Sequence, residues 1–130
     1  MTIKTKLLFI LIGDDRTGKT TLQKLLIEKL CNHSYERLPV NFEFDITHPE
    51  IKRKYHRISF GNRSYQEKKG DYGTVDEYFL NHFKNSDIAF ISSHLTPNDI
   101  QEMITNGRRR FYNVNGVFLS NSIETNNELN

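Results

Sequence analysis

The sequence has little cysteine and little net charge, and each shortage excludes a class of protein. Cys31 is the single cysteine among 130 residues, so no internal disulfide can form. Its place among leucines favours a buried, small apolar side chain over a reactive thiol. The formal net charge is +2, which gives no general electrostatic case for a nucleic-acid or acidic-membrane partner.

Long apolar runs are also missing. The run LLFILI at 7–12 follows Lys4 and Lys6, as the core of a signal peptide would, but it has only six residues. Asp14 and Asp15 follow it where small residues would be needed for cleavage. The run is also far too short to span a membrane. We therefore expect a cytoplasmic protein with no membrane partner and interpret the run as a buried strand.

Length and composition fit one globular domain. The chain is 36% hydrophobic and 26% charged, and no internal repeat or linker divides it. We predict a single nucleotide-binding domain over residues 1–120, on the grounds of the motif described below. Residues 121–130 are polar and lack a core-facing period, so we expect a frayed tail.

Strand and helix patterns alternate along the chain. Apolar or alternating runs predict strands at 5–12, 38–45, 87–92 and 112–120. Helical spacing and capping signals predict helices at 20–31, 74–83 and 96–107. A basic surface segment is expected at 51–57, and Gly61-Asn62 favours a hairpin turn within 56–65. This order predicts an α/β fold of three layers, with a small, mainly parallel sheet flanked by helices.

The two later helices carry specific start and stop signals. Thr74 and Glu77 have the spacing of a capping box. Thr96 is placed as an N-cap with Pro97 at the first helical position, and Gly107 is expected just past the helix end.

Residues 13–20 have the spacing G-x-x-x-x-G-K-[ST], with a strand before and an amphipathic helix after. Glycines let successive N–H groups converge on a phosphate, and the start of the helix adds unpaired N–H groups. Lys19 would reach the β- and γ-phosphates, and the Thr20 hydroxyl would bind Mg²⁺. The motif predicts ATP or another nucleoside triphosphate with Mg²⁺, bound by Gly13, Asp14, Asp15, Arg16, Thr17, Gly18, Lys19, Thr20 and Thr21.

The stretch GDDRTGKTTL resembles the P-loop of thymidylate kinases and related deoxynucleotide kinases, which reads G-x-D-R-x-G-K-[ST]-T. The resemblance covers about residues 7–30 and implies a P-loop NTPase fold. It also implies transfer of the γ-phosphoryl group from ATP to a nucleotide acceptor. Carried over, Asp15 would contact the acceptor sugar and Arg16 would clamp the group in transit, completing a catalytic set with Lys19. Asp14 occupies a position that the family leaves free, so we expect it to be solvated.

The rest of the chain departs from that family. NRSY at 62–65 stands where the family has D-R-[YS], so Asn62 replaces an aspartate, while Arg63 remains a candidate ligand for an acceptor phosphate. Arg108, Arg109 and Arg110 follow Gly107, where lid arginines would lie, or they form a basic turn that only aids solubility. The chain is also shorter than typical members.

A second acidic group for the metal has no clear position. Asp45 ends the strand expected at 38–45, and we treat it as a candidate metal ligand beside Thr20 as readily as a solvated strand end. The strand at 87–92 leads into Ser92, Ser93 and His94. The hydroxyls there could hydrogen-bond a γ-phosphate but supply no charge to a metal, and His94 is better explained as a surface histidine.

The sequence therefore predicts a small phosphotransferase, with Mg-ATP as donor and a nucleotide-like acceptor. The alternative is a nucleotide-dependent regulatory or binding protein with slow or no hydrolysis. A GTPase-like loop also tolerates an aspartate after its first glycine, but no strand leads into D-x-x-G and 121–124 departs from N-K-x-D. The acceptor, the preference between ATP and GTP and the oligomeric state are left open.

Overall fold

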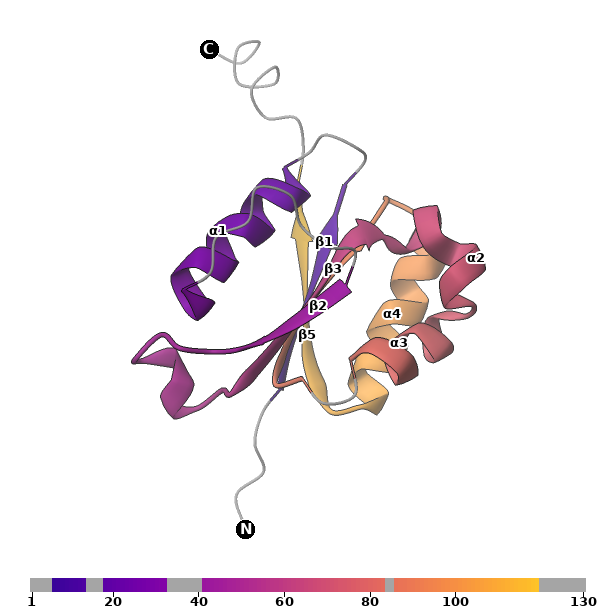
Figure 1. Ribbon diagram of the computed structural model, residues 1–130. Helices are drawn as coiled ribbons and strands as arrows, with labels where there is room; N and C mark the ends of the chain where they lie inside the picture. The colour runs from indigo at the N-terminus through magenta and orange to yellow at the C-terminus, as the bar shows by residue number, and fades with distance from the viewer. Residues whose placement is uncertain (1–5, 14–17, 33–40, 84–85, 120–130) are drawn as a thin grey trace.

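The computed structural model describes residues 6–13, 18–32, 41–83 and 86–119. A five-stranded sheet crosses the molecule in the order β2-β3-β4-β1-β5 (Figure 1). β3, β4, β1 and β5 run parallel, and β2 pairs antiparallel with β3. The strands are β1 (Lys6–Ile12), β2 (Asn41–Asp45), β3 (Arg57–Ser64), β4 (Ile88–Ser93) and β5 (Tyr112–Phe118).

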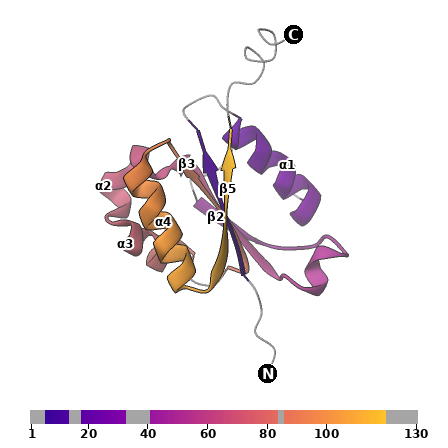
Figure 2. The same ribbon diagram turned by 180° about the vertical axis from the view of Figure 1, so that it is seen from behind.

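Helices cover both faces of the sheet, as the views from front and back show (Figures 1 and 2). α1 (Lys19–Cys31) lies on one face, whereas α2 (Lys69–Tyr72), α3 (Val75–His82) and α4 (Pro97–Arg109) lie on the other. Short 3-10 turns occupy η1 (Ile51–Arg53) and η2 (Tyr65–Lys68). The predicted α/β fold with a mainly parallel, helix-flanked sheet is confirmed at this level. None of the helices in the described ranges is long and apolar enough to span a bilayer.

The central strand β1 divides the core between the two faces. Leu8 and Ile10 pack into the cluster under α3 and α4, while Leu11 packs with Ile27 of α1. This two-sided burial explains why 7–12 is apolar throughout rather than alternating. Cys31 is 2% exposed, as expected, and burial raises the pKa of its thiol to about 11.

The hairpin prediction at Gly61-Asn62 is wrong. β3 runs without a turn through these residues, and the antiparallel hairpin is instead formed by β2 and β3 around η1. Gly61 serves close packing: a Cβ there would lie 2.6 Å from the Tyr78 hydroxyl oxygen. The glycine that suggested a turn makes room for a helix side chain.

The helix signals are partly confirmed. Thr74 caps α3, with its Oγ1 accepting from the Glu77 N–H at 3.2 Å and Glu77 Oε1 accepting from the Thr74 N–H at 3.4 Å. Thr96 is the N-cap residue of α4 and Pro97 its first residue, as predicted. Gly107, however, lies inside α4 rather than past its end. A Cβ on Gly107 would meet Leu8 Cδ2 at 2.7 Å and Val114 Cγ2 at 2.8 Å, so this glycine lets the helix approach the sheet.

Candidate functional site

The turn between β1 and α1 opens at the carboxyl edge of the parallel strands. The Gly13 N–H donates to the Ser93 carbonyl at 2.9 Å and so continues the pairing of β1 with β4. Gly18 precedes α1 with φ of 92°, a left-handed conformation that favours glycine. The intervening candidates Asp14, Asp15, Arg16 and Thr17 lie outside the described residues. The two ends of the predicted phosphate loop lie at a junction of strand and helix, as the motif requires.

The Lys19 side chain folds back from α1 to Gly13, the last described residue before the turn. Its Nζ donates to the Gly13 carbonyl at 2.5 Å, and the residue is 8% exposed. A charged amine is thereby held next to the backbone that the motif assigns to phosphate. Water screens such a shielded charge less than an exposed one, so an anion at this position would be attracted strongly.

Thr20 lies one residue further into α1 and points to β3. Its Oγ1 donates to Asn62 Oδ1 at 2.9 Å, and the contact is exposed. Thr21 is exposed on the same turn. The structure therefore brings Asn62 beside the hydroxyl that sequence analysis assigned to Mg²⁺, although the two residues are 42 positions apart.

A buried polar network anchors the first turns of α1 to the sheet. Gln23 is fully buried, and its Nε2 donates to Ser92 Oγ at 3.1 Å and to the Lys19 carbonyl at 3.3 Å. Ser92 Oγ in turn donates to the Gly61 carbonyl at 2.7 Å. The Ser92 hydroxyl proton is therefore used within the protein and is not available to hydrogen-bond a phosphate. Gln23 escaped sequence analysis, and its only signal was a polar residue among apolar ones on the buried face of the helix.

Gln66 of η2 organises the neighbouring end of β4. Its Nε2 donates to Ser93 Oγ at 2.9 Å and to Asp99 Oδ2 at 3.1 Å, and its Oε1 accepts from the His94 N–H at 2.9 Å. His94 Nε2 lies 3.5 Å from Glu67 Oε1. Ser93 and His94 thus belong to a network that ties η2 and α4 to the strand end beside the loop.

Asp45 is not brought to Thr20. β2 runs antiparallel, so Asp45 pairs in register with Arg57, the first residue of β3, and its Oδ1 accepts from Arg57 Nη1 at 2.9 Å. Thr20 contacts Asn62, five residues along β3 from Arg57, which is about 16 Å of strand. The expected metal site shared by Thr20 and Asp45 is corrected: the two lie at opposite edges of the sheet.

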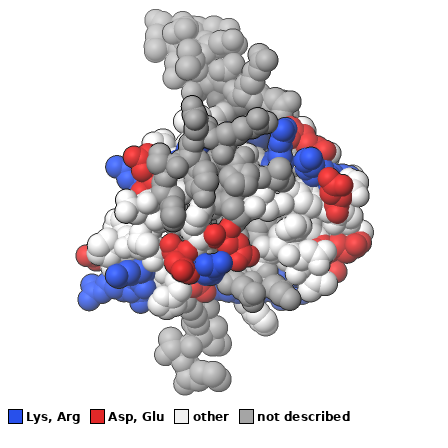
Figure 3. All heavy atoms as spheres, in the orientation of Figure 1, with Lys and Arg blue, Asp and Glu red and all other residues white. Residues whose placement is uncertain are grey.

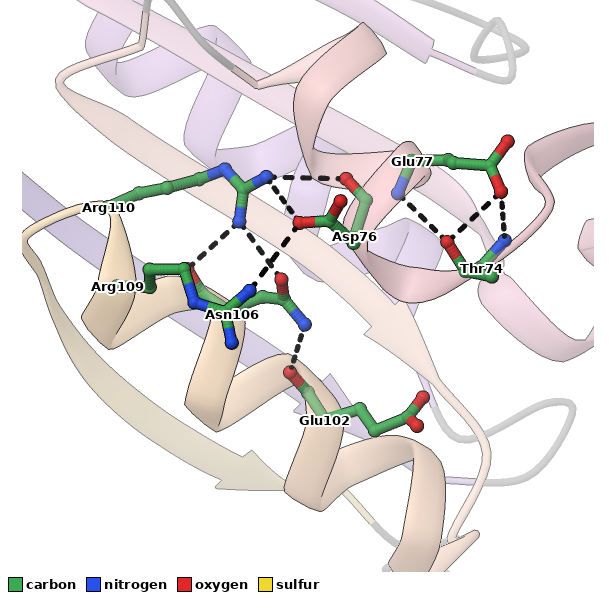
Figure 4. Close-up of polar contacts among 7 residues, drawn as sticks. All are labelled: Thr74, Asp76, Glu77, Glu102, Asn106, Arg109 and Arg110. Carbon is green, nitrogen blue, oxygen red and sulfur yellow. Dashed lines mark hydrogen bonds and ion pairs between the residues drawn. The ribbon is translucent and has the colours of Figure 1, made fainter.

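The three arginines also lie away from the loop. α4 begins after the carboxyl end of β4 and ends where β5 starts, so Arg108, Arg109 and Arg110 lie at the amino edge of the parallel strands. Arg110 donates to Asp76 Oδ1 at 2.8 Å and to Asn106 Oδ1 at 3.0 Å (Figure 4). Its hydrogen bond holds the pKa of Asp76 below its usual value. Arg109 also lies 3.7 Å from Asp76. Arg109 and Arg110 therefore join the end of α4 to α3 rather than forming a lid over the loop.

Oxygen donors for a metal are few within the described ranges. They contain no group of three or more histidine, cysteine or acidic side chains arranged to hold an ion. Thr20 and Asn62 offer a hydroxyl and an amide oxygen, which suits Mg²⁺ because this ion needs one or two protein oxygens and keeps several waters. Both ligands are neutral, so any charge on the metal would be balanced chiefly by the phosphates.

No family model, no curated protein and no solved structure matches this chain. The geometry of the turn and its neighbours is therefore the basis on which a function can be assigned.

Proposed function

We propose that the protein binds a nucleoside triphosphate with Mg²⁺ at the turn between β1 and α1. The observation that carries this proposal is the Lys19 amine, which is buried against the Gly13 carbonyl at the start of a helix that follows a left-handed glycine. Phosphate would add charge pairing for Lys19 and hydrogen bonds for the N–H groups of the first helical turn. The Thr20 hydroxyl and Asn62 Oδ1 contact each other at the start of the same helix, and we treat both as candidate ligands for the metal.

Regulated binding, with slow or no hydrolysis, is the activity that the surroundings support best. β4, the strand beside β1, ends on Ser92 and Ser93, and neither carries a carboxylate. The side chain beside the Thr20 hydroxyl is the neutral amide of Asn62, so it adds no negative charge for a metal. Charge that would build up on a migrating phosphoryl group needs cations, and Arg110 is held at the other edge of the sheet.

Phosphoryl transfer to a nucleotide-like acceptor remains the second candidate. Arg63 follows Asn62 on β3, is exposed, and lies 3.4 Å from Glu67, and it would be the candidate ligand for an acceptor phosphate. The loop residues Asp15 and Arg16 add the resemblance to deoxynucleotide kinases. Together these features would supply acceptor contacts without adding an acidic group for the metal.

The first test is calorimetric titration of Mg-ATP and Mg-GTP into three forms of the protein. Lys19→Ala should weaken binding at least tenfold, which is about 1.4 kcal/mol, because it removes the cation at the phosphates. Lys29→Ala is the matched control: it removes the same charge from the last turn of α1, and it should leave affinity within about twofold. Equal affinities of wild type and Lys19→Ala would sink the proposal.

Release of ADP from Mg-ATP, with and without a panel of nucleoside monophosphates, separates the two activities. A flat response in a protein that binds ATP supports regulated binding. A rise of about tenfold or more with one acceptor would correspond to about 1.4 kcal/mol of barrier lowering and would establish the kinase.

A further inference from the structure

The strand β5 forms one edge of the sheet, and its outer side has no partner strand among the described elements. It pairs in parallel with β1 along its whole length, from Tyr112 opposite Lys6 to Phe118 opposite Ile12. In the view from behind, β5 lies at the front between α4 and α1, and no described helix or strand crosses it (Figure 2). The outer backbone groups of β5 are therefore open to another strand.

The hydrogen bond at the end of β5 shows which backbone groups are open. The Leu119 N–H donates to the Ile12 carbonyl at 2.8 Å, so the odd-numbered residues of β5 turn their N–H and C=O groups toward β1. Successive residues of a strand turn these groups to opposite sides. The outer side therefore presents the N–H and C=O groups of Tyr112, Val114, Gly116 and Phe118.

The other edge strand, β2, is protected by charge, whereas β5 is not. β2 carries Glu43 and Asp45, which pair with Arg57 of β3 at 3.0 and 2.9 Å. Figure 3 shows acidic and basic side chains side by side at the front of the molecule, where β2 lies in Figure 1. The seven residues of β5, YNVNGVF, include no charged residue and no proline. Natural edge strands use such residues against unwanted pairing, so the composition of β5 favours pairing.

Two exposed aromatic rings flank this open strand. Phe111, just before β5, is 80% exposed and Phe118, its last residue, is 73% exposed, which makes them the two most exposed large hydrophobic residues in the described ranges. Phe111 also has φ of 66°, a left-handed conformation that is unfavourable for a bulky residue. Both rings are held in water beside the strand edge, where a second strand would bury them.

From the open, uncharged edge and the two exposed rings, we infer that β5 pairs antiparallel with β5 of a second copy of this chain. A two-fold axis at Asn115 sets this residue opposite itself and Val114 opposite Gly116. Phe118 of each copy lies opposite Tyr112 of the other. In this register the residues with outward backbone groups face one another, as the hydrogen-bonded pairs of an antiparallel ladder require.

The composition of β5 favours a second copy over an unrelated peptide. Across a two-fold axis a residue near the centre meets its own kind, so a charged residue there would face an equal charge, and β5 has none. Phe111 and Phe118 of the two copies together offer up to about 600 Å² of exposed surface. That is about half of the roughly 1,200 Å² buried in a small stable interface, and the paired strands add to it.

The dimer is independent of the nucleotide proposal. Because the two β5 strands run antiparallel, the carboxyl edges of the two parallel sheets point in opposite directions. The two turns at Lys19 therefore lie at opposite ends of the joint sheet, and no nucleotide bridges them. Lys19→Ala should leave the association unchanged.

Sedimentation equilibrium of the full chain, from about 5 to about 500 μM, measures the association. The average mass should rise from one chain toward two, with a Kd of about 1–100 μM for an interface of this size. Phe118→Lys should weaken association about tenfold or more, because it removes an apolar ring and adds a charge to the paired strands. Leu95→Lys makes the same change at a residue that is 62% exposed and lies outside β5, so it should alter association less than about twofold.

A cysteine substitution at the axis tests the register. In a non-hydrogen-bonded antiparallel pair the facing Cα atoms lie about 4.5 Å apart, which a disulfide can span. Oxidised glutathione should therefore link most chains of Asn115→Cys into pairs on a non-reducing gel. Asn113→Cys is the matched control: residue 113 faces residue 117 of the other copy, and its own counterpart lies about 14 Å away, so it should link at least about tenfold less. Wild type, whose Cys31 is buried, should not link.

A chain that stays monomeric at about 500 μM overturns the proposal. Equal linking of the two cysteine variants would overturn it as well, because the copies would then not pair about Asn115. Equal weakening of association by Phe118→Lys and Leu95→Lys would show that contact does not run through β5, with the same consequence.

Discussion

Lys19 and Thr20 are adjacent in α1 but turn to different partners. Lys19 reaches back to the Gly13 carbonyl, and Thr20 reaches across to Asn62 on β3. A cation and a hydroxyl are therefore held on two sides of the helix start, where phosphate and metal can be bound separately. At the scale of single residues, Asn62 would decide how much charge the proposed Mg²⁺ meets beside Thr20.

Asn62→Asp should strengthen the dependence of nucleotide binding on Mg²⁺. A carboxylate 4 Å from the divalent ion would attract it by about 2–8 kcal/mol, depending on the effective dielectric. We therefore expect the Mg²⁺ concentration for half-maximal binding of ATP to fall at least about threefold, as measured by titrating Mg²⁺ against a fluorescent ATP analogue.

Asn62→Ala is the control for that substitution. It removes the hydrogen bond to Thr20 without adding charge, so it should not lower the Mg²⁺ requirement. If Asn62→Asp leaves the Mg²⁺ requirement where it is in the wild type, Asn62 does not lie beside the bound metal.

The glycine and lysine positions of the loop could be predicted because the motif depends on neighbours in sequence. Gly18 needs a left-handed backbone and Lys19 must follow it, and both requirements are local. The contact of Thr20 with Asn62 could not be predicted in the same way, because the order of strands in the sheet decides which strand end faces α1.

Helices and strands show where a local signal has more than one physical cause. Gly107 resembled a helix stop, but in α4 it permits close packing on Leu8 and Val114. In the same way, the alternation of apolar and polar residues in β2 predicted a strand without giving its direction in the sheet. The antiparallel pairing of β2 is what carries Asp45 to the edge remote from the loop.

Gly107→Ala should destabilise the protein by about 1–2 kcal/mol. The helical preference of alanine gains about 0.5–1 kcal/mol, but a Cβ at 2.7–2.8 Å from the Leu8 and Val114 side chains overpacks the core by about 1–3 kcal/mol. Urea unfolding followed by circular dichroism measures the difference.

Gly70→Ala is the matched control, since Gly70 lies in α2 and a Cβ added there would meet no atom of the neighbouring described elements within 4 Å. It should be neutral or stabilising by about 0.5 kcal/mol. Equal effects of the two substitutions would show that Gly107 has no special packing role.

At the scale of the whole molecule, the sheet holds the candidate nucleotide site at one edge of its parallel strands. The turn at Lys19 opens at the carboxyl edge beside α1, where ligands of parallel α/β sheets usually bind. The alternation of strands and helices made the layers predictable, whereas the order β2-β3-β4-β1-β5 arises from long-range pairing that no short segment encodes.

The most direct test of the central claim is the location of bound nucleotide by ¹H–¹⁵N NMR. Addition of Mg-ATP should shift the amides of Gly18, Lys19 and Thr20 most strongly, because these residues begin the helix at the proposed phosphate site. AMP, which lacks the β- and γ-phosphates, should shift them far less. Shifts centred elsewhere, or none at Lys19 and Thr20 under saturating Mg-ATP, would contradict the account.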